Sequence, residues 1–241
     1  WYAPGMNLHR TPYNGRNLGY YSEDAVLAGT AGSYLCQSLN RYGVVAQMKH
    51  FAFNDQETNR DGIAVFLNEQ AARENELRGF QMVVRDGQAK GIMSAFNRIG
   101  LTHVAADQNL MLGILRGEWG FNGYLITDSV KSTQYFLPRE DLMAGNDMML
   151  GGSNNGKVWN MTVEAVQTDP VVQQGLREAF HRKLYLRVNG VHMNGITPDA
   201  NASGGLVWWA LLLRILMGVC FVGFTVYVVL FTIRSRKEGR Q

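Results

Sequence analysis

The chain has 241 residues, of which 46% are apolar and 11% aromatic, and its formal net charge is +3. This composition is too apolar and too aromatic for an intrinsically disordered protein. Two cysteines exclude a disulfide-built scaffold, and the five histidines show no zinc-ligand spacing, so we expect no metal and no other cofactor.

The positive charge is concentrated at one end of the chain. Residues 1–205 carry 18 Lys and Arg against 19 Asp and Glu, whereas residues 206–241 carry five bases and one acid. A basic surface for nucleic acid would instead lie on the folded part of the chain. We therefore expect no nucleic-acid partner.

Helical and strand-like patterns alternate between residues 20 and 190. Acids in the first turn, capping residues and closing glycines set the ends of the helices, and short apolar runs mark the strands. The predicted strands are 44–48, 91–95, 123–127 and 147–150, and the predicted helices are 22–42, 68–86, 107–116, 139–144 and 169–188.

This alternation predicts an α/β fold with parallel strands. A closed TIM-type (β/α)₈ barrel needs eight strands and about 250 residues. Only residues 1–190 are available here, with four clear strands. We therefore expect a partial TIM-type (β/α)₈ barrel, its second half, with the first strands encoded upstream of Trp1.

The C-terminal region contains an uncharged run at 215–233. A helix of that length is about 28 Å long, close to the hydrocarbon thickness of a bilayer. A buried core helix is the alternative. We expect a polar linker at 191–205, a membrane-proximal and transmembrane helix at 206–233 with its core at 215–233, and a basic cytoplasmic tail at 234–241. The positive-inside rule then places residues 1–190 outside a cell membrane crossed once.

Polar side chains follow three of the four predicted strands. Lys49 and His50 follow the first, Phe96 and its polar neighbours the second, and Asp128 and Ser129 the third. Catalytic groups of β/α barrels lie at the carboxyl ends of the strands. We expect the cations to lower the pKa of Asp128, which suits nucleophilic or electrostatic catalysis. Taken singly, Asp128 also fits a helix cap, Lys49 a surface residue and His50 a hydrogen-bonded strand end.

Four segments, 3–24, 49–60, 92–100 and 120–129, closely resemble the catalytic barrel of glycoside hydrolase family 3, the β-glucosidase-type retaining enzymes. The resemblance covers roughly residues 1–190. It implies an exo-acting glycosidase that cleaves the O-glycosyl bonds of β-glucosides or related oligosaccharides, with Asp128 as the nucleophile of a covalent glycosyl-enzyme.

The same resemblance implies the residues of a sugar site. Its hydroxyl-binding side chains are Arg16, Lys49 and His50, and its apolar wall is formed by Met93 and Phe96. Two departures from the family pattern stand out. Gly19 replaces a frequent Glu, and Ser129 replaces the common Trp after the nucleophile, which implies a more open leaving-group site.

No segment of the chain matches the domain that supplies the general acid/base in β-glucosidase-type members. A retaining mechanism needs a second carboxyl about 5–5.5 Å from the first. Some relatives carry the domains in permuted order, so we expect the acid/base in a domain upstream of Trp1. The alternative function is a non-catalytic, membrane-displayed carbohydrate-binding module.

Overall fold

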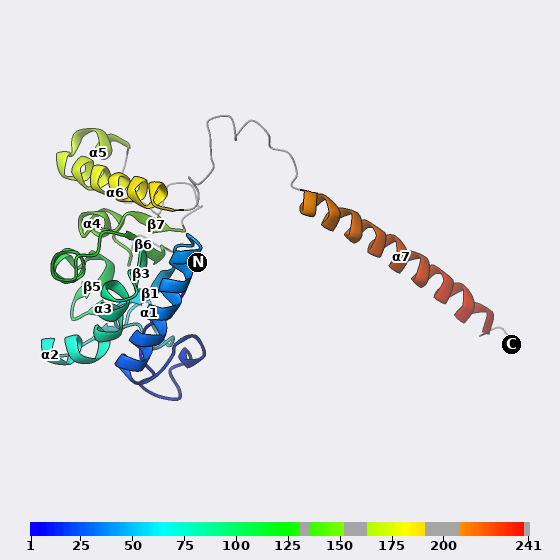
Figure 1. The fold of residues 1–241 in the computed structure, drawn as a ribbon, viewed down its shortest axis with the longest axis horizontal. Helices are drawn as coiled ribbons and strands as arrows, with labels where there is room; N and C mark the ends of the chain where they lie inside the picture. The colour runs from blue at the N-terminus through cyan, green and yellow to red at the C-terminus, as the bar shows by residue number, and fades with distance from the viewer. Residues whose placement is uncertain (131–134, 152–162, 191–207, 239–241) are drawn as a thin grey trace. The chain divides into compact units, whose positions relative to one another are not determined.

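The computed structural model describes residues 1–130, 135–151, 163–190 and 208–238 (Figure 1). It divides into two units, Trp1–Asn194 and Gly195–Gln241. The first unit contains the sheet and the packed helices, and the second contains one long helix.

The first unit is built on a four-stranded parallel sheet with the order β1-β3-β6-β7. Its strands are β1 (Gln47–Phe51), β3 (Gly91–Ser94), β6 (Tyr124–Ser129) and β7 (Met148–Leu150). Each strand lies beside the one that precedes it in this series, as successive β/α units do in a barrel. All four predicted strands are confirmed, although β1 begins three residues later than predicted.

The N-terminal segment adds a strand-like edge to the sheet beside β1. Gly5 forms a parallel bridge with Lys49, whose backbone N–H donates to the carbonyl of Pro4 at 2.8 Å. The backbone N–H of Gln47 likewise donates to the carbonyl of Trp1 at 2.7 Å. The sequence does not predict this strand, because Pro4 and Gly5 interrupt any apolar alternation.

The helices agree with the predicted set in position, with differences in their inner geometry. The predicted helix 68–86 is a composite of two α-helical pieces joined by a π-helical turn, and the predicted helix 107–116 is π-helical. The elements are α1 (Ala25–Arg41), α2 (Glu69–Ala71), η2 (Ala72–Glu76), α3 (Arg78–Arg85), η4 (Asn109–Glu118), α4 (Pro138–Met143) and α6 (Pro170–Val188).

Several short elements are absent from the sequence prediction, because runs of two to six residues show no usable periodicity. Three strands form a second small sheet in the order β2-β4-β5. These elements are η1 (Asn17–Gly19), β2 (Ala64–Val65), β4 (Arg98–Ile99), β5 (Thr102–His103), η3 (Val104–Ala106) and α5 (Val163–Thr168).

The main core lies between one face of the sheet and helices α1 and α3. Phe51 of β1 packs edge-to-face on Phe80 and on Trp119, with ring centroids 5.3 and 5.9 Å apart. Helix α1 approaches α3 closely at Gly29, where a Cβ would lie 3.2 Å from the Cα of Gly79. Small residues at this crossing keep the helices near the strands that carry the polar residues.

The two faces of β6 have different partners because successive side chains of a strand alternate. Leu125 points to the core beneath the helices, whereas Tyr124 and Ile126 belong to a separate cluster with Met93. Asp128 is two residues beyond Ile126 and therefore lies on this second face.

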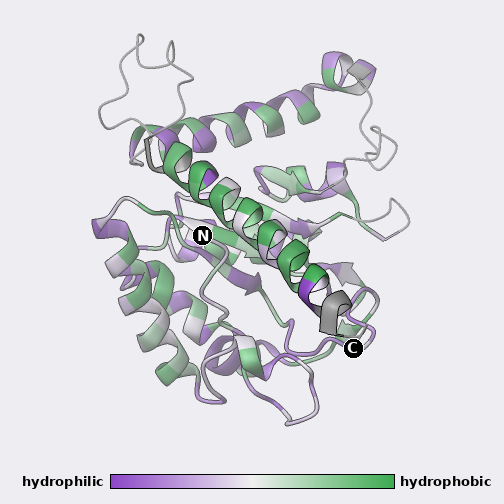
Figure 2. Ribbon diagram, turned by 90° about the vertical axis from the view of Figure 1, so that its right-hand side faces the viewer, coloured by the Kyte–Doolittle hydropathy of each residue, from purple (hydrophilic) through white to green (hydrophobic). Residues whose placement is uncertain are grey.

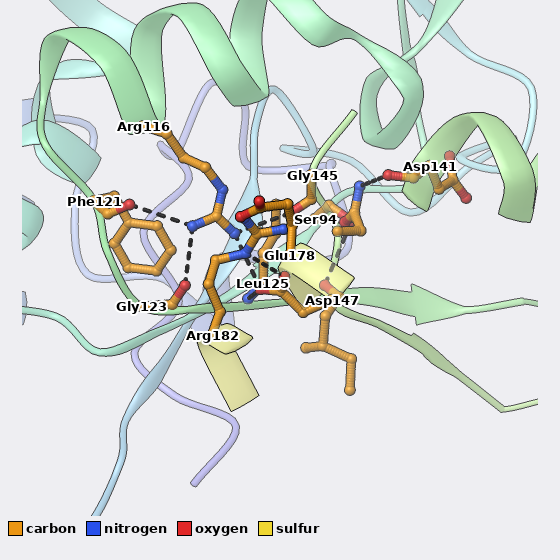
Figure 3. A network of polar contacts seen from close by, with 12 residues as sticks. Ser94, Arg116, Phe121, Gly123, Leu125, Asp141, Gly145, Asp147, Glu178 and Arg182 are labelled. Carbon is orange, nitrogen blue, oxygen red and sulfur yellow. Dashed lines mark hydrogen bonds and ion pairs between the residues drawn. The ribbon is translucent and has the colours of Figure 1, made fainter. Parts of the chain in front are cut away.

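A buried ion-pair network links α6 to the amino-terminal end of the strands, opposite to the end that carries Asp128 (Figure 3). Asp147, just before β7, contacts Arg116 of η4 at 3.0 Å and Arg182 of α6 at 2.5 Å. The same carboxylate accepts the backbone N–H of Leu125 at 2.8 Å. Burial raises the pKa of Asp147, and the two arginines act against that rise.

The second unit contains α7 (Trp208–Glu238), which is hydrophobic along most of its length (Figure 2). Its segment Leu211–Arg234 is long and apolar enough to cross a membrane. A helix is thus present where the transmembrane helix is predicted, and it continues five residues beyond the predicted end at 233. The predicted linker 191–205 lies outside the described residues.

Candidate active site

Asp128 lies at the carboxyl end of β6, with its side chain 14% exposed. Its Oδ1 accepts the backbone N–H of Ser129 at 2.8 Å, and its Oδ2 is 3.4 Å from Nε2 of His50 at the end of β1. The parallel strands β1, β3 and β6 thus bring together side chains 78 positions apart in the sequence, as predicted from their places at strand ends.

His50 is buried and held from two sides. Its backbone N–H donates to Oδ1 of Asn7 at 2.8 Å, and its Nδ1 is 3.4 Å from the hydroxyl of Tyr20. That hydroxyl donates to the carbonyl of Asn54 at 2.5 Å. Burial lowers the pKa of His50 well below its usual range, and neighbouring cations lower it further. The imidazole is therefore neutral at neutral pH and can take part in hydrogen bonds without carrying a charge.

Three cations act on the Asp128 carboxylate: Arg60, Lys49 and Arg16. Each of them, together with the Ser129 N–H, lowers the pKa of Asp128, but burial raises it by more, so the pKa lies above its usual value. The expectation of a lowered pKa is therefore wrong, because desolvation of the carboxylate outweighs the attraction of the cations.

Arg16 and Lys49 line a cavity of about 450 Å³ together with Tyr20 and Glu57. This volume is within the range of small-molecule sites, about 300–1,000 Å³, and Asp128 and His50 are not among the residues that line it. Burial and the nearby Arg16 lower the pKa of Lys49. Gly19 also lines the cavity, and no heavy atom lies within 4 Å of where its Cβ would be.

The site thus combines one half-buried carboxylate with neutral and cationic hydrogen-bond donors. Such donors suit a ligand rich in hydroxyl groups, and the carboxylate can stabilise positive charge or attack an electrophilic carbon. Among the described residues, no group of three or more His, Cys, Asp or Glu side chains could hold a metal ion.

Comparison with known proteins places the chain in a family. Residues 1–186 match the family described as the glycosyl hydrolase family 3 N terminal domain. The chain belongs to glycosyl hydrolase family 3. This confirms the resemblance seen in the four sequence segments, and the first unit has the TIM-type α/β fold of that domain.

The similar proteins of family 3 are β-glucosidases. The chain is 42% identical over 126 residues to a β-glucosidase of Ruminococcus albus, covering 52% of the chain and 13% of that protein. It is 33% identical over 198 residues to probable β-glucosidase I of Emericella nidulans, covering 82% and 23%. β-Glucosidase 3B of Thermotoga neapolitana, solved in complex with glucose, aligns with a TM-score of 0.72 and 34% identity, covering 80% of the chain and 27% of that structure.

The chain therefore spans about a quarter or less of the length of these relatives. The roles of individual residues stay predictions, and the structure adds where each residue lies.

Met93 and Phe96, predicted as the apolar wall of the sugar site, are both buried. Met93 packs with Ile126 on the face of the sheet that carries Asp128. The ring of Phe96 packs edge-to-face on Phe136 at 5.3 Å, and the guanidinium of Arg60 covers it at 4.4 Å. The ring of Phe96 therefore supports the guanidinium of Arg60, which lies on top of it.

Arg60 is a residue beside Asp128 that the sequence analysis does not single out. Of the three cations it lowers the pKa of Asp128 the most, more than the predicted Lys49 and Arg16. Its place at the end of the resembling segment 49–60 was a signal, but the loop offers no periodicity that would aim its side chain. Ser129, by contrast, lies where predicted, next to Asp128.

Proposed function

We propose that this family 3 chain provides the nucleophile and the sugar-binding groups of a retaining, exo-acting β-glycosidase of the β-glucosidase type. The observation that carries the proposal is the Asp128 carboxyl at the end of β6, 3.4 Å from the buried His50 and acted on by three cations. The β-glucosidase names of the relatives support a β-glucoside or related oligosaccharide as substrate.

In this reaction the Asp128 carboxylate attacks the anomeric carbon while the bond to the leaving-group oxygen breaks, giving a glycosyl ester. A second carboxyl donates a proton to the leaving oxygen and later removes one from the water that hydrolyses the ester. Arg16, Lys49 and His50 hold the sugar hydroxyls, and Ser129 faces the leaving-group side.

The general acid/base is assigned to a domain outside this chain. Support for this assignment comes from the sequence, in which no segment matches the domain that carries the acid/base in β-glucosidase-type members. The chain matches only 23% of the length of probable β-glucosidase I, so most of such a protein lies outside the matched part. We propose in the same way that further strands, encoded upstream, complete the barrel.

We place the enzyme at the cell membrane, with α7 as a single span, residues 1–190 outside and the basic tail in the cytoplasm. The apolar segment Leu211–Arg234 and the bases that follow it support this placement. Extraction of membranes with alkaline carbonate should leave the full chain in the pellet, and its release into the supernatant would contradict a transmembrane span.

Turnover of an activated aryl β-glucoside tests the function, because a good leaving group reduces the need for the acid. The full protein should hydrolyse it, and Asp128→Asn should lower kcat by at least about 10³-fold, whereas Asp107→Asn at the start of η4 should not.

A carbohydrate-binding module without catalysis is the second candidate. The cavity lined by Arg16, Lys49, Tyr20 and Glu57 favours it, because such polar groups can bind sugar hydroxyls without any cleavage. Binding of the aryl glucoside with no release of phenol by the complete protein would establish the binding module and contradict the glycosidase.

A further inference from the structure

Glu57, in the loop after β1, contacts two of the three cations that act on Asp128. Its Oε1 is 2.9 Å from Nη1 of Arg16, and its Oε2 is 3.3 Å from Nη1 of Arg60. We propose that Glu57 is a positioning residue, whose one carboxylate fixes both guanidinium groups for contact with sugar hydroxyls. This inference rests on the proposed function and extends it.

Both arginines need such a partner, because neither lies in a regular helix or strand. Arg16 precedes the short η1 turn, and Arg60 lies in a turn before β2. Fixing a free arginine side chain costs conformational entropy. Each guanidinium also lies near one aromatic ring, Arg16 at 5.8 Å from Tyr20 and Arg60 at 4.4 Å from Phe96.

The aromatic rings and the carboxylate provide different restraints. A ring supports the flat face of a guanidinium, whereas a charge-assisted hydrogen bond at Nη1 sets how that plane is turned. With Nη1 held by Glu57, the remaining N–H groups of each arginine keep a constant direction. A constant direction is what recognition of a neutral, hydroxyl-rich ligand requires.

Glu57 is itself fixed at the place where two loops meet. Its backbone N–H donates to the carbonyl of Asn14 at 2.9 Å, and the side chain of Asn14 accepts the backbone N–H of Arg16 at 2.8 Å. Between them Gly15 has φ +76°, and a Cβ there would lie 3.5 Å from the Cβ of Glu57. The loop after β1 and the turn at 14–17 are therefore held together around this carboxylate.

Charge balance gives a second reason for Glu57. Arg16, Lys49 and Arg60 all act on Asp128, and Glu57 neutralises part of that charge through direct pairs with two of them. Without Glu57, the Asp128 carboxylate becomes a competing partner for Arg16. A guanidinium paired with Asp128 would be lost to the sugar and would also block the nucleophile.

Gly19 offers a way to test this role by rescue. It lines the same cavity as Arg16 and Glu57, and a Cβ at this position meets no heavy atom within 4 Å. A glutamate introduced there can extend into open space beside Arg16. Gly19→Glu should thus replace the lost partner of Arg16 in a chain that lacks the Glu57 carboxylate.

Arginine Nε–H signals in ¹⁵N NMR of the full chain in detergent micelles report the bridge without any need for activity. Signals assigned through R16K and R60K should be shifted and slow to exchange in the wild type. E57Q should return the Arg16 signal to the free-arginine position and move the Arg60 signal toward it only in part, because Nε of Arg60 also lies 3.9 Å from Asp61. E118Q is the matched control, since Glu118 pairs with the Nη atoms of Arg73 and with neither Arg16 nor Arg60, and it should leave the Arg16 and Arg60 signals unchanged. Unchanged Arg16 and Arg60 signals in E57Q would overturn the proposal.

Kinetics of the complete protein with an aryl β-glucoside separate positioning from general stability. E57Q should raise KM about tenfold or more while kcat changes by less than about threefold, and G19E in the E57Q background should recover the part of the loss in KM that comes from Arg16. An unchanged KM in E57Q would overturn the positioning role. A wild-type protein that neither binds nor cleaves sugars would refute the proposed function, while the NMR result still decides whether Glu57 fixes the two arginines.

Discussion

At the scale of single residues, the site depends on the Asp128 carboxylate, whose burial costs free energy of desolvation. Burial raises the pKa of Asp128 against the effect of three cations, and it lowers the pKa of the adjacent His50. A sequence can place both residues at strand ends, since strand and loop positions follow from patterns. It cannot predict the balance between desolvation and attraction, which depends on how deeply each group lies.

For the same reason, two sets of contacts near Asp128 differ from or go beyond what the sequence predicts. Phe96 was predicted from the resemblance to face the sugar, yet Arg60 covers its ring. Arg60 comes from an irregular loop, where no periodicity predicts the direction of a side chain. The contacts of Glu57 with two arginines are hidden from the sequence for the same reason.

Replacement of Asp128 by Asn should stabilise the fold at neutral pH while removing activity. Because the folded pKa of Asp128 is raised, the folded chain carries a penalty for the buried charge above that pKa, and the penalty disappears below the unfolded value near 3.8. D128N should therefore have the higher melting temperature at pH 7, and the difference should shrink as the pH falls toward 4. A D128N chain less stable than wild type at pH 7 would contradict this account.

At the scale of elements, the order and type of the large helices and strands could be predicted, and their inner details could not. The cap residues Asp24, Asn68 and Asp169 mark helix starts in the sequence and accept the expected backbone N–H groups in the structure. The π-helical geometry of η2 and η4 leaves no sequence signal as clear as a cap. The edge formed by residues 1–6 depends on hydrogen bonds to β1, which lies about 40 residues away in sequence.

The attachment of α6 to the sheet should depend on Asp147. Asp147→Asn leaves Arg116 and Arg182 without their shared carboxylate in a buried setting, and breaking such a pair costs about 3–5 kcal/mol. Asp169→Asn is the matched control, because it keeps a side chain that can cap α6 and loses only a more exposed pair with Arg139, which contributes little to stability. Urea unfolding measures the free energy of unfolding of both variants. Equal losses would show that the buried network stabilises the fold no more than the exposed pair does.

At the scale of the whole molecule, the net charge of +3 reports the organisation of the chain. The bases that exceed the acids lie after residue 205, most of them within α7, whose segment Leu211–Arg234 is apolar enough to span a membrane. The first unit has the α/β fold of the family 3 N-terminal domain, and its length is about a quarter of that of the similar β-glucosidases. An acid/base outside this chain is proposed at this scale, since the relatives extend well beyond the matched part.

Covalent trapping tests the central claim that Asp128 is the nucleophile. The complete protein, incubated with a 2-deoxy-2-fluoro aryl β-glucoside and digested, should give one modified peptide, with the fluorinated sugar on Asp128 in β6. The D128N protein should give none. A label on another carboxylate, or a wild-type protein that turns over the aryl glucoside without any label, would contradict the account.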